Sequence, residues 1–263
     1  MLDSPRVFED PLSLRIVGPE RASQIRSGKI TRQQRLSPSF RAYMAVRSRY
    51  AEDELAKAVR SGVRQYVVLG AGLDTFSCRN PHASVGLRVF EVDYPATQAW
   101  KREQLDAAGI AVPADVVFVG ADFERQTIAD ALCSVDFRFD ESAFFSWLGV
   151  VQYLTERAFE ETLSFIASMP VRSGVVLDYA VDRSLLNPAE RLALDALSAR
   201  VAAAGEPFEL FFDPDVLAFR LREMGFTSVE DLGRDEMNAR YFSGRKDKLR
   251  VKGNLAHLLT AHV

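Results

Sequence analysis

The chain has 263 residues, of which 48% are hydrophobic and 26% charged, and its formal net charge is −3. Such a length and composition allow a globular protein with a substantial core. The weak negative charge gives no broad attraction to nucleic acid or to an anionic membrane surface, so we expect neither partner.

The sequence also disfavours a metal site and a membrane span. Cys78 and Cys133 lie far apart and the three histidines are scattered, so no metal-ligand spacing is present and we expect no metal. The N-terminus lacks the apolar core of a signal peptide, and no apolar run approaches the roughly 18 residues of a membrane span. These features favour a cytoplasmic location.

Residues 1 to about 60 are predicted to form a helical cap. They contain no convincing strand, and the segment from Phe40 to Val59 carries large apolar residues at roughly helical intervals. No internal repeat or low-complexity linker divides the chain, so residues 1–263 are predicted to form a single domain.

Short β-type runs follow, separated by segments long enough for helices. This alternation predicts an α/β fold with a parallel sheet and right-handed crossovers. The predicted strands are Tyr66–Leu69, Leu87–Val92, Val116–Val119, Ala143–Leu148 and Val175–Tyr179.

The chain after the fifth run is predicted to be mainly helical. The Ala- and Leu-rich segment Pro188–Ala204 is typical of an amphipathic helix, and we expect it to belong to a helical insertion, about residues 183–210, that covers the site as a lid. Asp213 and Pro214 supply the cap and the first residue of a further helix. Tyr241–Arg245 is predicted to close a last antiparallel hairpin at the sheet edge.

The first predicted strand breaks into a loop with two closely spaced glycines, Gly70-Ala71-Gly72. Glycine lets the backbone turn sharply and approach a ligand closely, because it lacks the Cβ that would block both. A dinucleotide fingerprint would continue to a third glycine, but Thr75 stands there and the turn carries an acid, Asp74. That carboxylate suits a cationic cofactor such as S-adenosylmethionine better than it suits NAD. A helix-capping role for Asp74 is at least as compatible with its position.

Acids also follow the second and third predicted strands. Asp93 lies about 20 residues beyond the glycines, the spacing of a carboxylate that accepts hydrogen bonds from ribose hydroxyls. Glu91 shares its face of the strand, but only Asp93 stands at the carboxyl end, where open α/β sheets bind ligands. Asp122 is placed to accept from an adenine amino group, with Phe123 packing on the ring. The three strand ends together predict an adenosine site.

Four stretches in combination closely resemble the leucine carboxyl methyltransferase-like family of S-adenosylmethionine-dependent methyltransferases, in its bacterial branch. They are Leu69–Thr75, Phe90–Pro95, Ala121–Phe123 and Ser146–Thr155. The resemblance runs from about Arg41 to the C-terminus. It implies a class I methyltransferase fold: a Rossmann-like, mostly parallel seven-stranded sheet with an N-terminal helical cap and a helical insertion.

The resemblance also implies roles for residues around the cofactor. Gly70 would lie under the methionine part, Asp93 would hold the ribose, and Asp122 with Phe123 would contact adenine. The neighbouring loop residues, Ala71, Gly72 and Asp74, complete the predicted cofactor site.

Two further positions follow from the family. An arginine of the N-terminal helix is expected to reach the cofactor carboxylate, and Arg47 is the best match, with Arg49 as the neighbouring alternative. Tyr153 falls on the substrate side and would orient the acceptor, although a packed core tyrosine fits equally well. The eukaryotic members carry an acid before this tyrosine where the present chain has Trp147-Leu148-Gly149, so their protein-tail substrate is not expected here.

These observations predict an S-adenosylmethionine-dependent O-methyltransferase acting on a small molecule. Methyl transfer from a sulfonium needs mainly alignment and exclusion of water. A carboxylate acceptor is already ionised, whereas a hydroxyl usually needs a general base, and the motifs contain no histidine. A carboxylate is therefore favoured, with a hydroxyl left open. The alternatives are an NAD-dependent oxidoreductase and a non-catalytic adenosyl-cofactor-binding protein.

Overall fold

The computed structural model describes residues 4–27 and 37–263. Its centre is a seven-stranded sheet in the order β3-β2-β1-β4-β5-β7-β6, in which β1 to β5 run parallel and β7 is antiparallel to both neighbours. The strands are β1 (Gln65–Leu69), β2 (Arg88–Asp93), β3 (Val116–Gly120), β4 (Ala143–Trp147), β5 (Gly174–Ala180), β6 (Ser228–Leu232) and β7 (Ala256–His262). The predicted α/β fold is confirmed, and the five expected strands agree with the observed ones to within one residue at each end.

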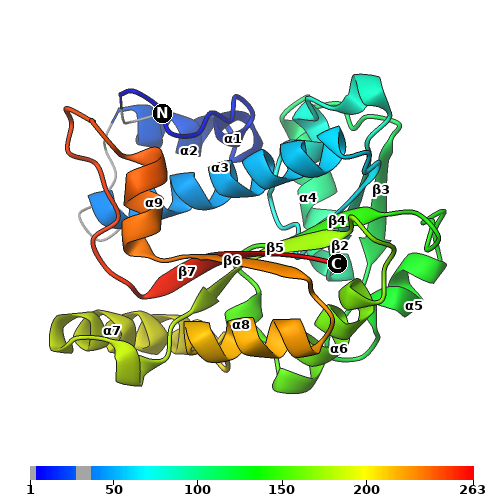
Figure 1. Ribbon diagram of the computed structural model, residues 1–263. Helices are drawn as coiled ribbons and strands as arrows, with labels where there is room; N and C mark the ends of the chain where they lie inside the picture. The colour runs from blue at the N-terminus through cyan, green and yellow to red at the C-terminus, as the bar shows by residue number, and fades with distance from the viewer. Residues whose placement is uncertain (1–3, 28–36) are drawn as a thin grey trace.

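Helices cover both faces of this sheet (Figure 1). The helices α3, α4 and α9 lie on one face, with α1 and α2 outside them, while α5, α6 and α8 lie on the other and α7 extends beyond the sheet. Their bounds are α1 (Ser13–Ile16), α2 (Pro19–Arg26), α3 (Pro38–Arg60), α4 (Pro95–Ala107), α5 (Ile128–Cys133), α6 (Glu156–Ala167), α7 (Pro188–Ala203), α8 (Pro214–Glu223) and α9 (Arg234–Tyr241). Short 3-10 turns, η1 (Phe76–Arg79) and η3 (Val151–Tyr153), follow β1 and β4.

The helices predicted before the first strand and after the fifth strand are present. Helix α3 contains the expected segment from Phe40 to Val59, while the parts of the predicted cap at residues 1–3 and 28–36 lie outside the described residues. Helix α7 matches the predicted lid helix. Helix α8 begins as expected, because the Asp213 side chain accepts hydrogen bonds from the backbone N–H groups of Asp215 and Val216.

The prediction of a hairpin at Tyr241–Arg245 is wrong. Tyr241 is the last residue of α9, and the antiparallel pair at the sheet edge is formed instead by β6 and β7, on either side of that helix. The charges of this segment favour a helix, because Asp235 and Glu236 stand in the first turn and Arg240 in the last. The prediction followed the aromatic pair Tyr241-Phe242 instead. Met237 anchors it by being fully buried.

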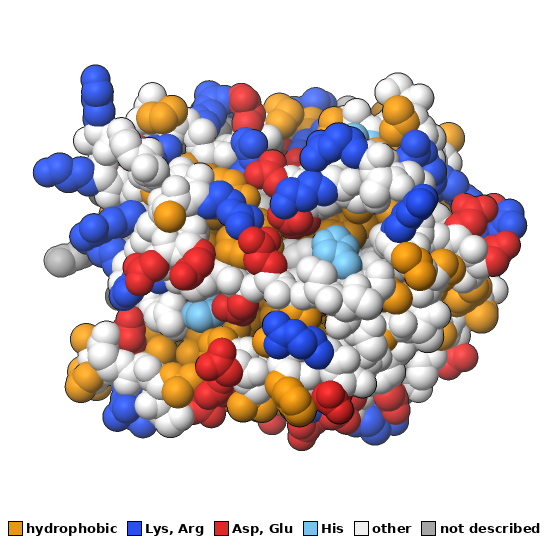
Figure 2. Space-filling model, in the orientation of Figure 1, with side chains coloured by type: hydrophobic (Ala, Val, Ile, Leu, Met, Phe, Trp, Pro, Cys, Tyr) orange, Lys and Arg blue, Asp and Glu red, His pale blue; other side chains and the backbone are white. Residues whose placement is uncertain are grey.

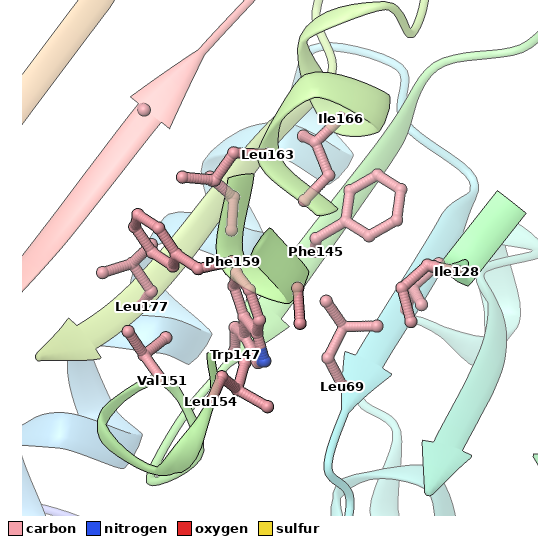
Figure 3. Packing of buried hydrophobic residues seen from close by; sticks show 14 of the residues in the cluster. Leu69, Ile128, Phe145, Trp147, Val151, Leu154, Phe159, Leu163, Ile166 and Leu177 are labelled. Carbon is pink, nitrogen blue, oxygen red and sulfur yellow. The ribbon is translucent and has the colours of Figure 1, made fainter. Parts of the chain in front are cut away.

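The core on the α6 face packs tightly against the middle of the sheet (Figure 3). Thr155 caps α6 by accepting from the backbone N–H of Ala158, and apolar residues then recur at helical intervals toward the sheet. The indole of Trp147 on β4 stacks on Phe159 of α6 with ring centroids 5.7 Å apart, and Leu177 of β5 packs beside them. This packing fixes the carboxyl end of β4, which borders the candidate site.

Every described helix is too short or too polar to cross a bilayer. On the face that Figure 2 shows, basic and acidic side chains are interspersed. The cytoplasmic location and the absence of a nucleic-acid partner stay predictions.

Candidate active site

The predicted site residues that follow β1, β2 and β3 lie together at the reversal point of the sheet. Strand β1 lies between β2 and β4, where the strand order changes direction, and ligands of open α/β sheets bind outside the carboxyl ends at such a point. The strand ends are tied together: the Gly70 N–H donates to the carbonyl of Val92 at 2.8 Å, and the Ala121 N–H donates to the carbonyl of Asp93 at 2.8 Å. The loops after β1, β2 and β3 are therefore neighbours, as predicted.

Both loop glycines adopt backbone conformations that favour glycine. Their φ angles are +67° at Gly70 and +46° at Gly72. A Cβ at Gly70 would stand 2.3 Å from Cγ2 of Val150, so the loop after β4 packs directly on this glycine. At Gly72 no heavy atom lies within 4 Å of such a Cβ, so this glycine faces open space.

Asp93 supports the glycine loop directly. Its Oδ2 accepts from the backbone N–H of Gly72 at 2.6 Å, and its Oδ1 accepts from that of Tyr94 at 2.7 Å. Ala71, between the glycines, is buried. Asp93 as a whole is only partly buried.

The other two predicted acids are exposed or half-buried. Asp74 is exposed, and its Oδ1 accepts from the backbone N–H of Phe76, the first residue of η1, at 2.6 Å. The residue directly before η1 is Thr75 and not Asp74. Asp122 accepts from the backbone N–H of Glu124 and lies 3.4 Å from Nε of Arg125. Both carboxylates thus stabilise local turns.

Phe123 follows Asp122 and is partly buried against the core of the α6 face. Its ring is held by this packing at the end of β3. It is therefore fixed in position beside the Asp122 turn.

The predicted arginine lies over the loop after β4. Nη1 of Arg47 is 3.3 Å from Oδ2 of Asp178, a residue of β5, and a Cβ at Gly149 would stand 2.7 Å from the same Nη1. By contrast, Arg49 is half-exposed and pairs with Asp53 one turn along α3. Of the two arginines, Arg47 is the one beside the site.

Asp178 was not predicted, yet it organises this region. Besides Arg47, its carboxylate accepts from the hydroxyl of Tyr43 at 3.0 Å and from the backbone N–H of Gly149 at 2.5 Å. An acid inside the apolar run of β5 is unusual, since Asp is almost never fully buried without partners. That anomaly was the signal in the sequence that could have identified it.

The pair leaves Arg47 charged and only partly satisfied. Burial opposes the charge, but Asp178, Tyr43 and Asp74 together outweigh it, and the pKa of Arg47 is raised above its ordinary value. The Nε of Arg47 is buried and has no hydrogen-bond partner. A buried guanidinium with an unpaired N–H fits an anionic ligand group, such as a carboxylate.

A cavity of about 760 Å³ opens beside this pair. Its walls come from α3, the loop after β4, the end of β5, helix α7 and residues 251–256. Arg47, Gly149, Asp178 and Tyr153 all line it. The helices predicted to cover the site thus form two of its walls.

Tyr153 belongs to the cavity wall rather than to the core. It is half-buried, and its ring lies 5.2 Å from that of Phe208, which lines the same cavity. Burial raises the pKa of the Tyr153 hydroxyl above its ordinary value. Burial and the nearby Asp178 carboxylate likewise raise that of Tyr43. Both phenols therefore stay protonated near neutral pH, and that of Tyr43 donates to Asp178.

Glu91 has a structural role away from the cavity. Its carboxylate forms a fully buried ion pair with Lys101 of α4 at 2.6 Å and accepts from the hydroxyl of Ser77 in η1 at 2.5 Å. The two acids of β2 thus differ as expected, since Asp93 alone stands at the strand end.

The N-terminal cap holds the glycine loop from outside. The hydroxyl of Thr75 donates to Oδ2 of Asp10 at 2.8 Å, and Leu73 packs with apolar residues of the first helical segment. Arg79 of η1 donates to Glu52 of α3 at 3.1 Å. Within residues 4–27 and 37–263, no three His, Cys, Asp or Glu side chains converge as metal ligands.

Sequence comparisons place this chain among methyltransferases. The family model for leucine carboxyl methyltransferase matches residues 2–167. A relative from Bacillus subtilis, YktD, named as an S-adenosyl-L-methionine-dependent methyltransferase, is 36% identical over 207 residues, which cover 77% of this chain and 67% of the relative. Another relative with such a name, from Parafrankia, is 36% identical over 136 residues, 51% of this chain and 43% of its own length.

Solved structures share the fold at low identity. A structure from Thermobifida fusca described as that of a methyltransferase has a TM-score of 0.60 and 15% identity, covering 97% of this chain and 95% of that one. A DUF574 family protein from Streptomyces avermitilis has a TM-score of 0.59 and 16% identity, covering 98% and 99%. These likenesses support the fold assignment.

Proposed function

Because the chain belongs to the leucine carboxyl methyltransferase family and is thus an S-adenosylmethionine-dependent methyltransferase, we propose that it methylates an oxygen, preferentially a carboxylate oxygen, of a small molecule. The family and the named relatives do not favour an NAD-dependent oxidoreductase or a non-catalytic binding protein.

The residues present fit the cofactor. Arg47 offers a buried, unpaired Nε–H to the methionine carboxylate, and Gly70 to Gly72 form a loop whose second glycine faces open space. Asp93, beside that loop, is placed for the ribose hydroxyls. When bound, S-adenosylmethionine supplies an electrophilic methyl group on a sulfonium.

The remaining cofactor roles are supported by position. Asp122 and Phe123 stand at the end of β3 next to Asp93, where adenine would follow the ribose. Asp74 keeps an exposed carboxylate on the glycine loop, close to where a cation would lie. Ala71 orders the loop between its two glycines by being buried.

The protonation and hydrogen bonding of the side chains in the cavity wall favour a carboxylate acceptor. The phenols of Tyr43 and Tyr153 are held protonated, and the two carboxylates of the described wall, Asp178 and Glu190, already accept hydrogen bonds within the protein. None of the described residues that line the cavity is a histidine. Such a wall is poorly equipped to remove a proton from a hydroxyl, whereas a carboxylate has no proton to lose.

The chain's contribution to the reaction is then alignment and desolvation. Arg47 and the glycine loop hold the donor, the Tyr153 hydroxyl donates a hydrogen bond that orients the acceptor, and α3 with α7 keep water from the reacting atoms.

Transfer of a labelled methyl group tests this proposal. Small carboxylic acids and phenols are incubated with methyl-labelled S-adenosylmethionine, and the products are treated with base. Volatile label released by base indicates a methyl ester and supports a carboxylate acceptor, whereas base-stable label indicates an aryl ether and a hydroxyl acceptor. The Arg47→Ala variant, which lacks the guanidinium, is expected to lose transfer.

A further inference from the structure

The cavity is bounded along one side by a continuous stripe of helix α7. Ala189, Ala193, Leu197 and Val201 all line it, and their spacing of four residues places them on one face of the helix. At a rise of 1.5 Å per residue, the 12 steps from Ala189 to Val201 span roughly 18 Å. The acceptor space is therefore elongated.

Helix α3 supplies the opposite wall, with a polar end and an apolar end. Phe40, Tyr43, Met44 and Arg47 line the cavity at the i, i+3, i+4 and i+7 positions of one helical face. Phe40 is 40% exposed, which for a large aromatic residue in a cavity wall is apolar surface left uncovered. The charged pair of Arg47 and Asp178 lies at the other end of the stripe, toward the cofactor loop.

Several polar side chains that line the cavity are already engaged within the protein. The Tyr179 hydroxyl donates to Asp231 at 2.5 Å, and Glu190 accepts from the backbone N–H groups of Asn254 and Asn187, each at 3.1 Å. The Ser39 hydroxyl accepts from the backbone N–H of Lys252 at 2.8 Å. Groups paired in this way leave apolar contact as the main means of recognising the body of an acceptor.

Hydrophobic side chains are also visible around α7 at the surface. In Figure 2 they gather at the lower left of the molecule, where Figure 1 places this helix.

We propose, resting on the proposed function, that the acceptor is an elongated aliphatic carboxylic acid whose hydrocarbon chain lies between α3 and α7. A carboxylate oxygen forms the new bond to the methyl carbon, the methyl–sulfur bond breaks, and its electron pair stays on sulfur. The anionic acid and cationic sulfonium become a neutral ester and a neutral thioether, so no proton is transferred. The apolar walls then recognise the hydrocarbon chain of the acid, and the site beside Arg47 positions its carboxylate.

A series of straight-chain acids tests the inference. Methyl transfer and calorimetric binding, the latter in the presence of S-adenosylhomocysteine, are measured for acids of two to fourteen carbons. Each further methylene that is buried should lower KM and Kd about fourfold, which corresponds to ~0.8 kcal/mol, until the cavity is filled.

Two tryptophan variants of α7 test where the hydrocarbon chain of the acid lies. Ala193→Trp fills the cavity and should raise KM and Kd for long acids at least tenfold, which is more than it raises those for acetate. Ala202→Trp is the matched control and should change neither KM nor Kd. Ala202 is exposed and lies nine residues beyond Ala193, so it is on the opposite side of the helix.

The outcomes separate the inference from the proposed function. Esters formed at equal KM from short and long acids would leave the carboxyl methyltransferase standing and overturn the aliphatic acceptor. Base-stable ethers formed from phenols, with no ester from any acid, would overturn both. Equal effects of the two tryptophan variants would also contradict the placement of the chain along α7.

Discussion

Arg47 and Asp178 form an ion pair across the cavity floor, with Nη1 and Oδ2 3.3 Å apart and side chains 18% and 6% exposed. The pair joins the N-terminal helix α3 to strand β5, two elements separated by 131 positions in the sequence. Because Gly149 also donates to Asp178, the acid links three elements around the candidate reaction centre.

Removal of the Asp178 charge should destabilise the protein strongly. Asp178→Asn leaves a buried guanidinium without its counter-charge, and breaking one half of such a pair costs about 3–5 kcal/mol. Tyr43→Phe removes only the hydrogen bond that its hydroxyl donates to the same carboxylate and should cost less, about 1.5–3 kcal/mol. Urea denaturation of both variants gives the comparison, and equal losses would show that the charge is unimportant.

Asp93→Ala should weaken binding of S-adenosylmethionine by about 5- to 150-fold, which corresponds to roughly 1–3 kcal/mol of lost hydrogen bonds. Calorimetry with S-adenosylmethionine, S-adenosylhomocysteine and NADH measures the effect, and NADH should bind neither form. Glu103→Ala, an exposed acid on α4, is the control and should bind as the unaltered chain does. Unchanged affinity of Asp93→Ala would mean that the ribose lies elsewhere.

The two loop glycines should respond differently to alanine. Gly70→Ala combines a positive φ with a Cβ 2.3 Å from Val150, whereas Gly72→Ala has only the positive φ, which costs about 1–2 kcal/mol. Thermal unfolding should therefore show a larger loss for Gly70→Ala. The double variant Gly70→Ala/Val150→Ala should recover the excess, and no recovery would place the strain in the backbone alone.

Much of this arrangement follows from local sequence signals. The alternation of apolar runs and helical segments fixes a parallel sheet, and the carboxyl ends of parallel strands necessarily meet at one edge. Positions at strand ends were therefore enough to predict that four residues lie close together: Gly70, Gly72, Asp93 and Asp122. Their proximity needs no knowledge of side-chain packing.

Residues that act through tertiary contacts were harder to find. Asp178 lies within a buried strand, and its role depends on Arg47, a residue of a helix that the sheet pattern does not position. Val150 gains its contact with Gly70 only when β1 and β4 become neighbours. At Tyr241 the local aromatic pair favoured a strand, while the charges of the preceding turns favoured the helix that is observed.

The buried pair of Glu91 and Lys101 predicts a pH-dependent stability. Burial raises the pKa of Glu91 above its ordinary value, although Lys101 and the Ser77 hydroxyl act to lower it. A carboxyl whose pKa is higher in the folded state binds its proton more tightly there. Its contribution to stability is therefore complete below the ordinary pKa of about 4.3 and is lost as the pH rises through the raised value.

Lys101→Met should enlarge this dependence, because it leaves the Glu91 carboxylate buried without a counter-charge. The loss of unfolding free energy should reach about 3–5 kcal/mol at pH 8 and become smaller at pH 5, where the carboxyl is protonated more readily. Urea denaturation at the two pH values measures the difference. The double variant Glu91→Gln/Lys101→Met carries no buried charge here, so it should recover most of the loss at pH 8 and be insensitive to pH at this site. A deficit in Lys101→Met that is the same at both pH values would instead assign the loss to packing of the lysine side chain.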